Sequence, residues 1–377
     1  MSRNVPKLRF KGFEDEWKEK KISDTLKIRH GKDQKLVAND LGKYPILGTG
    51  GIIGKSNEFL YDKESVLIGR KGTIDRPFYM NTPFWTVDTL FYSEIKKGFC
   101  AKFLYYSFQR INWKKYSEAS GVPSLSASTI ESIKYILPEL NEQEKIANFL
   151  SKVDSIIEKQ EKKVQYWNSY KKGMIQKIFS QKIRFKDDNG RDYPEWEENK
   201  LEDYIMEYTE KTVIDNQYPV LTSSRKGLML QSEYFKDRQV TTDSNIGYFV
   251  IPRGYITFRS RSDDGIFVFN QNNIIDKGII SYFYPVFNFN ESINKYYALI
   301  YMNNYLKKEI FKEVVGTSQL VLSMSKLKKL KIKFPCLDEQ IKIANFLSNI
   351  DNIIEKESKK LEELKQWKKG LLQQMFV

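Results

Sequence analysis

Histidine and cysteine are almost absent from this chain, which has one His and two Cys among its 377 residues. Cys100 and Cys336 give neither a disulfide framework nor the spacing of metal ligands, and we predict that both are ordinary packing residues. His30 lies in a polar stretch without a clustered carboxylate or cysteine, so we interpret it as a surface or loop residue rather than a catalytic one. This composition nearly excludes a zinc site.

Long hydrophobic runs are also missing, because the apolar stretches are short and broken by charged residues. Residues 1–13 carry basic side chains but no hydrophobic core. We therefore expect no transmembrane helix, no signal peptide, no membrane partner and a cytoplasmic location. A hydrophobic content of 41% over 377 residues can bury more than one core and predicts a soluble, globular protein of two or three domains.

Some stretches resemble catalytic motifs, but each lacks residues or spacing that the motif requires. No G-x-x-x-x-G-K-[ST] occurs, and GTGGIIG at residues 48–54 lacks both the lysine and the G-x-G-x-x-G spacing, so we expect a loop there. Residues 81–84 resemble the N-P-P-F motif of adenine methyltransferases but lack its first proline. No glycine-rich cofactor motif accompanies them. Glu198 and Lys200, downstream of Asp187, resemble the carboxylate–lysine set of a nuclease. Such short matches are common in a chain with 29% charged residues. We predict a non-catalytic chain that binds no cofactor and no metal.

One long segment is used twice. Residues 142–159 return as residues 339–356 with fourteen of eighteen positions identical, and the same offset of 197 residues continues as far as Phe179 and Phe376. The repeat divides the chain into two halves that close with the same element.

This element has apolar residues at heptad spacing. The first copy has rows of Ile146, Val153, Trp167 and Met174, and of Leu150, Ile157, Val164 and Ile178. The second copy has rows of Ile343, Ile350, Leu364 and Leu371, and of Leu347, Ile354, Leu361 and Met375. The pattern predicts two helices, each roughly 55 Å long, that pack as an antiparallel coiled coil and hold two globular bodies apart.

Polar residues interrupt these rows at matching places, Gln160 and Glu357 on one row and Lys171 and Lys368 on the other. They either fix the register of the coiled coil or mark where the apolar stripe meets water.

The segments outside the helices open alike, since residues 6–24 have a cognate in residues 182–203. Trp17 and Trp196 are the apolar anchors of these openings, and each is expected to pack its lobe onto a helix end. We predict an α+β fold with two α/β lobes, separated by two long helices that form an antiparallel coiled coil, as a pseudo-twofold repeat. The predicted segments are the first lobe (1–140), the central helix (141–180), the second lobe (181–337) and the C-terminal helix (338–377).

β-branched and aromatic runs between glycines predict strands within both lobes, at residues 44–60, 65–74, 84–95, 218–235 and 249–270. Apolar spacing predicts a helix at residues 101–113 and another at residues 295–311. Lysine alternates with apolar residues at 330–334, which predicts a half-exposed strand with a basic outer face. Because similar ends surround dissimilar middles, we predict two recognition surfaces with different specificities.

Positive charge is concentrated in the lobes. The net charge is +14, of which the helical repeats at residues 142–179 and 339–376 carry only +3 and +1. The remaining +10 is what a polyanion-binding surface on globular domains requires, although a generally basic protein is the alternative.

Arginine, lysine, serine and glycine in turns after apolar strands are the candidate ligand-binding residues. Residues 70–73 and 259–263 occupy comparable turns, and serine-containing stretches close each lobe. An arginine binds a guanine edge or a phosphate, the sequence leaves both open, and each residue can also belong to a solvated turn. The candidate residues are Arg70, Lys71, Gly72, Thr73, Ser124, Ser126, Ser223, Arg225, Lys226, Arg259, Ser260, Arg261, Thr317 and Gln319.

Three motifs carry a resemblance to a known family. They are the proline, acidic-EQ-x-x-IA-x-x-L segments at residues 138–150 and 335–347, the G-x-x-x-L stretches at 121–125 and 316–320, and the glycine-rich residues 48–54. Together they make the chain, over nearly its whole length, similar to the specificity subunits of type I restriction–modification systems. The second lobe departs from this pattern at residues 222–225, so glycine-dependent roles do not transfer to it.

The resemblance implies a subunit without chemistry of its own, in which two target-recognition domains alternate with two long helices. Such a subunit binds two half-sites of double-stranded DNA and places methyltransferase (modification) and restriction/translocase subunits on them. The resemblance thus implies that the candidate residues of the turns are DNA-binding residues. It binds no cofactor, and S-adenosylmethionine, ATP and Mg are implied for the partner subunits. The alternative function is a coiled-coil assembly scaffold without DNA readout, which salt-dependent, sequence-selective DNA binding would exclude.

Overall fold

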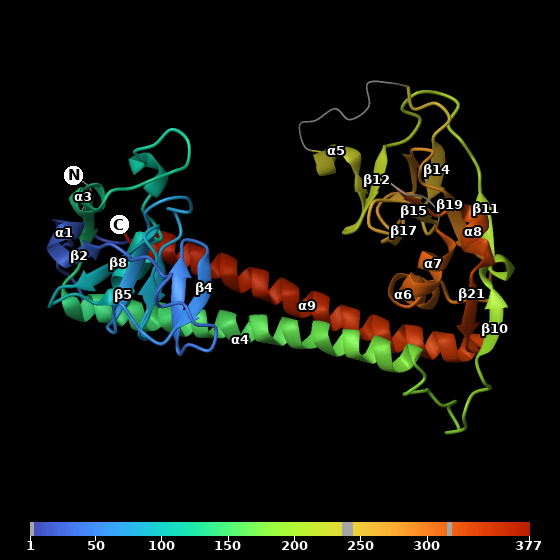
Figure 1. The fold of residues 1–377 in the computed structure, drawn as a ribbon, viewed down its shortest axis with the longest axis horizontal. Coiled ribbons are helices and arrows are strands. Elements are labelled where there is room, and N and C mark those ends of the chain that lie inside the picture. The colour runs from blue at the N-terminus through green and yellow to red at the C-terminus, as the bar shows by residue number, and fades with distance from the viewer. Residues whose placement is uncertain (1–3, 236–243, 315–318) are drawn as a thin grey trace. The chain divides into compact units, whose positions relative to one another are not determined.

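The computed structural model describes residues 4–235, 244–314 and 319–377 (Figure 1). The chain forms two compact units. Unit 1 comprises Met1–Lys163 with Glu357–Val377, and unit 2 comprises Val164–Lys356. Each unit therefore holds one lobe together with part of both long helices, whereas the four segments expected from the sequence are divisions along the chain and stay a prediction.

The repeated segments form the long helices α4 (Leu140–Phe179) and α9 (Leu337–Met375). Acidic residues lie in the first turn of each, where they face the positive end of the helix dipole. In unit 1, Asp154 contacts Lys368 at 2.6 Å and Lys163 contacts Glu357 at 2.7 Å, so the helices run antiparallel. Within the described residues, no helix is both long and apolar enough to cross a membrane.

The apolar rows of the helices serve two packing interfaces. Ile146, Leu150 and Val153 are at most 2% exposed and belong to the same core cluster as Phe103 of the first lobe. The apolar stripe therefore packs against a lobe as well as against the other helix, whereas the heptad pattern predicted only the packing between the two helices.

The polar interruptions of the rows contact one another or an acidic partner. Gln160 is 7% exposed and donates to the carbonyl and carboxylate of Glu357, its own repeat counterpart. Lys171 contacts Asp351 in unit 2, as Lys368 contacts Asp154 in unit 1. These residues are thus engaged in helix pairing, and their role in selecting the register stays a prediction.

The first lobe contains short strands and helices in unit 1. They are β1 (Lys18–Lys21), α1 (Ile22–Thr25), β2 (Leu26–Arg29), β3 (Tyr44–Gly48), β4 (Gly51–Ser56), β5 (Ser65–Gly69), β6 (Phe78–Met80), β7 (Trp85–Thr86), β8 (Leu90–Ile95), α2 (Ala101–Phe108), η1 (Trp113–Tyr116), α3 (Ala127–Ser132) and β9 (Lys134–Leu137). The strand order is β2-β8-β5-β6 in a four-stranded sheet, β4-β3-β7 in a second sheet, and β1-β9 in an antiparallel pair.

The second lobe repeats this plan in unit 2. Its elements are β10 (Glu197–Lys200), η2 (Leu201–Asp203), β11 (Ile205–Tyr208), β12 (Leu221–Ser224), β13 (Gly227–Leu230), α5 (Gln231–Phe235), β14 (Phe249–Pro252), β15 (Ile256–Phe258), β16 (Arg261–Ser262), β17 (Phe269–Gln271), β18 (Lys277–Ile280), β19 (Val286–Phe289), α6 (Lys295–Asn304), α7 (Lys307–Glu313), β20 (Leu320–Val321), α8 (Met324–Lys329) and β21 (Lys331–Phe334). The sheet order β11-β19-β15-β17 corresponds to β2-β8-β5-β6, and β10-β21 corresponds to β1-β9.

Two predicted helices differ in detail from the structure. The helix expected at residues 101–113 is α2, which ends at Phe108 before the short η1, and the helix expected at 295–311 is split into α6 and α7. The predicted basic strand is confirmed as β21, in which Lys331 and Lys333 are exposed while Ile332 and Phe334 are buried.

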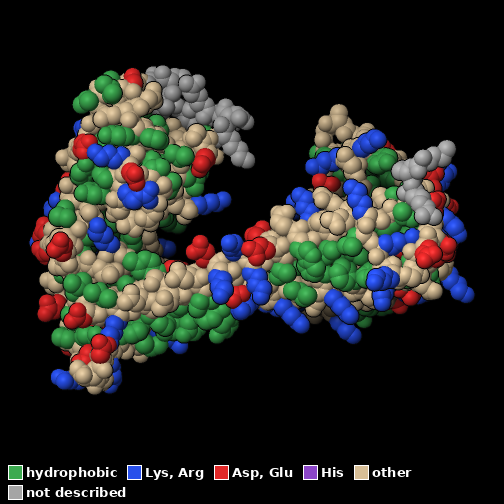
Figure 2. Space-filling view, turned by 180° about the vertical axis from the view of Figure 1, so that it is seen from behind, with side chains coloured by type: hydrophobic (Ala, Val, Ile, Leu, Met, Phe, Trp, Pro, Cys, Tyr) green, Lys and Arg blue, Asp and Glu red, His purple; other side chains and the backbone are tan. Residues whose placement is uncertain are grey.

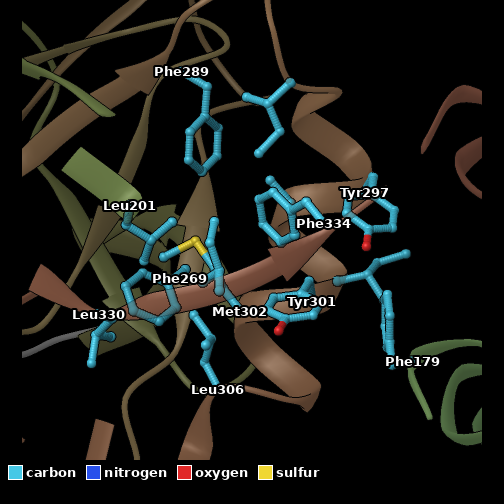
Figure 3. Close-up of a cluster of buried hydrophobic side chains, with 14 of the residues drawn as sticks. Phe179, Leu201, Phe269, Phe289, Tyr297, Tyr301, Met302, Leu306, Leu330 and Phe334 are labelled. Atoms are coloured by element: carbon cyan, nitrogen blue, oxygen red, sulfur yellow. The ribbon is translucent and has the colours of Figure 1, made fainter. Parts of the chain in front are cut away.

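Aromatic residues anchor the helix ends in each lobe. In unit 2, Phe179 at the end of α4 lies 5.2 Å from the ring of Tyr301 within the core shown in Figure 3. In unit 1, its repeat counterpart Phe376 stacks on Phe103 at 5.2 Å and meets Trp17 at 6.2 Å. The expectation that Trp17 packs its lobe onto a helix end is confirmed.

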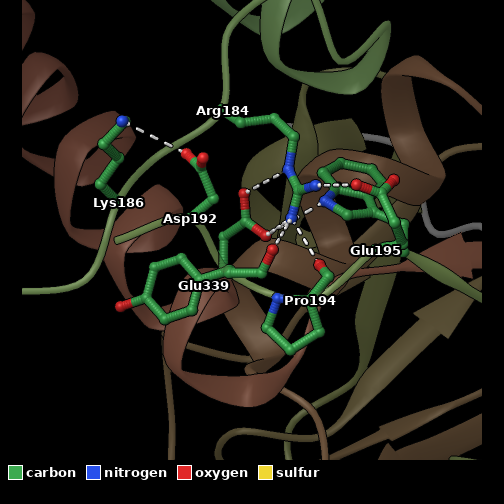
Figure 4. A network of polar contacts seen from close by, with 8 residues as sticks. Arg184, Lys186, Asp192, Pro194, Glu195 and Glu339 are labelled. Atoms are coloured by element: carbon green, nitrogen blue, oxygen red, sulfur yellow. Dashed lines mark hydrogen bonds and ion pairs between the residues drawn. The ribbon is translucent and has the colours of Figure 1, made fainter. Parts of the chain in front are cut away.

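A buried arginine–glutamate pair joins the opening of each lobe to a long helix. Arg9 donates two hydrogen bonds of 2.8 Å to Glu142, which is 3% exposed. Arg184 is bonded to Glu339 at 2.9 and 3.3 Å, and Glu339 is fully buried (Figure 4). Trp196 also donates to Glu339, at 3.2 Å, which places this predicted anchor on the start of α9.

The glutamine that follows each of these glutamates is a second joint. Gln143 donates to the carbonyl of the proline five residues before it and accepts from the amide of Cys100, which precedes α2. Gln340 makes the same proline contact and accepts from the amide of Asn294, which precedes α6. The repeated Glu-Gln motif is therefore explained by lobe-to-helix packing.

Candidate nucleic-acid interface

The first basic turn (residues 70–73) leaves β5 and is held by backbone hydrogen bonds from distant segments. The Arg70 amide donates to the Thr89 carbonyl at 2.8 Å. The Arg70 carbonyl accepts from the Leu125 amide at 2.9 Å. Two loops that are remote in sequence therefore fix the position of the turn.

Glycine is required at two positions of this turn. A Cβ on Gly69 would lie 2.1 Å from the carbonyl oxygen of Thr73, which is impossible without moving the backbone. Gly72 has a φ of +92°, a conformation that L side chains rarely adopt. The side chains of Arg70 and Lys71, which lie between these two glycines, are exposed.

The two cations of the first basic turn differ in their surroundings. Arg70 donates to the carbonyl of Asp88 at 3.3 Å and lies 3.9 Å from the carboxylate of the same residue. Lys71 is exposed, and its ammonium has no ion pair among the residues that the structure describes. Gly72 and Thr73 are half-buried and contribute mainly backbone to the turn.

The closing stretch of the first lobe lies against this turn. Ser124 pairs with Lys71 through an isolated β-bridge. Ser126 is the N-cap of α3, because its hydroxyl accepts from the Thr129 amide at 3.1 Å, and it also donates to Glu118 at 2.7 Å. The Ser126 hydroxyl therefore already has structural partners, whereas no hydrogen bond of the Ser124 side chain occurs in the described part of the chain.

A depression of about 800 Å³, here the first depression, gathers four predicted residues of the first lobe. The four are Arg70, Lys71, Ser124 and Ser126. His30, which was expected to be a loop residue and lies 4.9 Å from the ring of Phe91, also lines it.

The second basic turn (residues 259–263) is built in the same way as the first. The Ser260 amide donates to the Phe283 carbonyl and the Ser260 carbonyl accepts from the Leu322 amide, both at 2.9 Å. Ser260 therefore occupies the place of Arg70, and Arg261 occupies that of Lys71. This correspondence between single residues could not be read from the sequence, in which the two stretches were only predicted to be comparable turns.

The arginines of the second basic turn are presented differently from each other. The guanidinium of Arg261 lies 4.3 Å from the centroid of the Phe283 ring, a cation–π contact that orients it. Arg259 is exposed and makes no hydrogen bond or ion pair with any described residue. Arg259 is thus the cation of this turn that is free to rearrange.

A hairpin brings further predicted residues to the second basic turn. The second hairpin, β12–β13, has Arg225 and Lys226 at its tip, and Arg225 contacts Asp264 at 2.6 Å. Ser223 is buried and accepts a hydrogen bond from Asn270, so it holds the hairpin on β17.

Most candidates of the second lobe line one hollow of about 870 Å³, here the second depression. Those candidates are Ser223, Arg225, Lys226, Arg259, Arg261 and Gln319. Ser260 contributes backbone to the turn, and Thr317 lies outside the described residues.

The corresponding first hairpin, β3–β4, carries apolar residues instead. Ile52 and Ile53 are 71% and 52% exposed, although isoleucine is usually buried. The hydroxyl oxygen of Thr49, in its turn, lies 3.7 Å from the position a Cβ on Gly72 would take. The first hairpin therefore adjoins the first basic turn, and its exposed isoleucines were not predicted as part of the site.

Comparison with known proteins agrees with this geometry. The model of the type I restriction modification DNA specificity domain matches residues 14–165 and 195–366. The chain belongs to this family. It is therefore a DNA sequence-recognition subunit of a type I restriction–modification system, works with DNA and other subunits of that system, and is not itself a catalytic subunit.

Individual specificity subunits match between 40% and 99% of the chain. The type I restriction enzyme MjaVIII specificity subunit of Methanocaldococcus jannaschii is 26% identical over 411 residues, which cover 95% of this chain and 91% of that protein. The EcoprrI specificity subunit of Escherichia coli is 27% identical over 157 residues, or 40% of this chain and 39% of that one. The crystal structure of the S subunit from M. genitalium has the same fold, with a TM-score of 0.62, 16% identity and coverage of 99% of both chains.

One helix-capping residue of the specificity subunit was not predicted, although the repeat offset of 197 residues identifies it. Ser126 plus 197 is Ser323, and Ser323 caps α8 by accepting from the Lys326 amide at 3.3 Å. Each cap is also 3.0 Å from a second serine hydroxyl, Ser128 or Ser325. The offset that relates the two long helices therefore also relates these two serines of the lobes.

Acidic residues lie in or beside both depressions, together with the cations. The Arg225 guanidinium lowers the pKa of the Asp264 carboxyl, and the hydroxyls of Thr129 and Ser126 lower that of Glu118. Both groups are therefore ionised at neutral pH. Figure 2 shows the same mixture more widely, with basic and acidic side chains interspersed over the visible face. The described residues contain no cluster of three or more His, Cys, Asp or Glu suited to a metal ion.

Proposed function

We propose that each lobe binds one half-site of a bipartite double-stranded DNA target through its basic turn, its hairpin and its closing stretch. One observation carries this proposal: the two lobes hold their basic turns by the same backbone pattern, while the side chains on those turns differ. A shared frame with different side chains is what two separate sequence specificities require.

The chemistry of the depressions suits a duplex. Exposed Lys71 and Arg259 can neutralise phosphates, which gives affinity without base selectivity. Arg261, oriented by Phe283, can present its planar guanidinium to the O6 and N7 atoms of guanine in the major groove. Phosphate contacts would position each lobe, and base contacts would select the sequence.

The partners in this proposal supply the chemistry. Methyltransferase subunits would bring S-adenosylmethionine, and restriction or translocase subunits would bring ATP and Mg. This chain would supply the DNA sequence at which they act. The joints of Arg9 with Glu142 and of Arg184 with Glu339 support a rigid transmission from lobe to helix, since a buried charge pair tolerates little movement.

The test is DNA binding by the chain assembled with its methyltransferase subunits. Host DNA methylation, mapped with and without the gene, gives the target sequence. Binding to that target and to a scrambled duplex is then measured over a salt series. We expect tighter binding to the target and a linear fall of log K with log salt. Binding that shows neither sequence preference nor salt dependence would favour the coiled-coil scaffold instead.

Exchange of residues 28–134 for those of a relative tests the assignment of one lobe to one half-site. We expect one half of the methylated sequence to change and the other to stay. A change in both halves would refute independent recognition by the lobes.

A further inference from the structure

Carboxylates lie in or beside each depression and contact the residues proposed to bind DNA. Asp264 contacts Arg225 of the second depression at 2.6 Å, and Asp263, which lines that depression, accepts from Gln319 at 3.0 Å. In the first depression, Glu118 accepts from the Ser126 hydroxyl, and the Asp88 carboxylate lies 3.9 Å from Arg70. Carboxylates repel phosphates, so they reduce general affinity for DNA and need another explanation.

The best-defined of these carboxylates is that of Asp264. One of its oxygens accepts from the Ser262 hydroxyl at 3.0 Å and from the Ile266 amide at 3.2 Å, which fixes its direction. The other oxygen receives the Arg225 guanidinium from the tip of the second hairpin. The contact links two loops that both line the second depression.

The Arg225–Asp264 ion pair is accessible and can be exchanged. The side chains are 63% and 45% exposed, so solvent screens the pair and its contribution to stability is small. DNA can therefore break it. A phosphate that takes Arg225 leaves the ionised Asp264 unpaired beside a polyanion, whereas a base amino group, cytosine N4 or adenine N6, can take the vacated place on the carboxylate.

We propose that Asp264 is a specificity-determining residue, which withholds Arg225 from non-cognate DNA and releases it when the cognate duplex offers a base amino group. This inference rests on the proposed function. Specificity then comes partly from a penalty on wrong sequences, in addition to favourable contacts with the right one.

The test uses Asp264→Asn in the chain assembled with its methyltransferase subunits. Asparagine keeps the shape and an accepting oxygen but removes the charge. We expect non-cognate affinity to rise, cognate affinity to change little, and the ratio between them to fall by about tenfold. Equilibrium binding to the target duplex and to duplexes altered in one half-site measures the ratio.

A matched control is available in the same lobe. Arg253 and Asp276 form an exposed ion pair at 2.9 Å, and neither residue lines the second depression. Asp276→Asn makes the same charge change, so it reports the general effect of removing a negative charge. An equal rise in non-cognate affinity for both variants would overturn the inference.

A second variant separates the inference from the proposed function and from misfolding. In an Arg225→Gln background, Asp264→Asn should raise non-cognate affinity no more than Asp276→Asn does, because the withheld cation is gone. A full effect in that background, or a loss of cognate affinity with unchanged non-cognate binding, would contradict the withholding role. Failure of the wild-type complex to prefer its target would remove the proposed function itself. Thermal unfolding midpoints of all variants check that they fold.

Discussion

The two hairpins occupy corresponding places beside the basic turns, yet their exposed side chains differ in chemistry. The first hairpin exposes Ile52 and Ile53 on β4, while the second exposes Arg225 and Lys226 at its tip. Behind the hairpins the lobes share the same four-stranded sheet order, the same backbone hydrogen bonds to the basic turn and the same kind of arginine–glutamate pair. The scaffold can thus carry an apolar or a cationic hairpin without a change in its core, which separates folding from recognition.

The largest expected effect concerns the arginine–glutamate pairs, and it tests whether they stabilise both lobes equally. Arg184→Met leaves the buried carboxylate of Glu339 without its cation and should lower the free energy of unfolding by about 3–5 kcal/mol. Arg9→Met should do the same through Glu142 in unit 1. Urea unfolding with hydrogen exchange measures the loss and locates it in one unit.

Arg191→Met is the matched control for this comparison, because Arg191 lies 4.0 Å from Asp187 and is 77% exposed. It should change stability by no more than about 1 kcal/mol. A loss in only one of the two lobes would show that the frames are not equivalent. Adding Glu339→Leu to Arg184→Met should restore stability, since no buried charge then remains.

A smaller effect distinguishes the cations at corresponding positions, Arg261 and Lys71. Arg261→Ala should cost about 1–3 kcal/mol of DNA affinity and relax base choice in one half-site, because an oriented guanidinium can contact guanine at two points. Lys71→Ala should weaken all sequences alike and lower the salt slope by about one. Binding to half-site libraries over a salt series checks both, with Arg253→Ala as control. Unchanged affinity and selectivity would mean that these residues belong to solvated turns and do not contact DNA.

The capping serines should respond equally if the repeat extends into the lobes. Ser126→Ala and Ser323→Ala each remove an N-cap and should each cost about 1 kcal/mol of stability. Ser325→Ala is the control, since its hydroxyl touches Ser323 but caps no helix. Chemical denaturation of the three variants measures the differences, and a neutral result at Ser323 alone would end the correspondence there.

The smallest effect concerns the exposed side chains of the two hairpins. Lys226→Ala should lower the salt slope of DNA binding by about one, because it removes a phosphate contact. Ile52→Ser should leave the slope unchanged and weaken binding by less than about 1 kcal/mol. The same salt series measures both. A reduced slope for Ile52→Ser would mean that the first hairpin acts by repositioning cations.

Much of the frame was predictable because its signals are local or periodic. Heptad spacing identified the long helices, alternation identified β21, and tryptophans marked the openings of the lobes. The candidate site was less accessible. The two basic turns were predicted to be comparable, but which of their residues correspond depends on backbone hydrogen bonds from loops far away in sequence. Ser126 is the N-cap of α3, and its contact with DNA stays a prediction.

By itself, the sequence determined that one helix occurs twice and that two different lobes are attached to it, since repetition and apolar period are properties of the chain alone. Only the tertiary structure decided which residues meet. Backbone pairing placed Ser260 rather than Arg259 opposite the closing stretch, and it set Asp264 against Arg225. Such contacts follow from the register of strands and the course of loops, which no local pattern of side chains specifies.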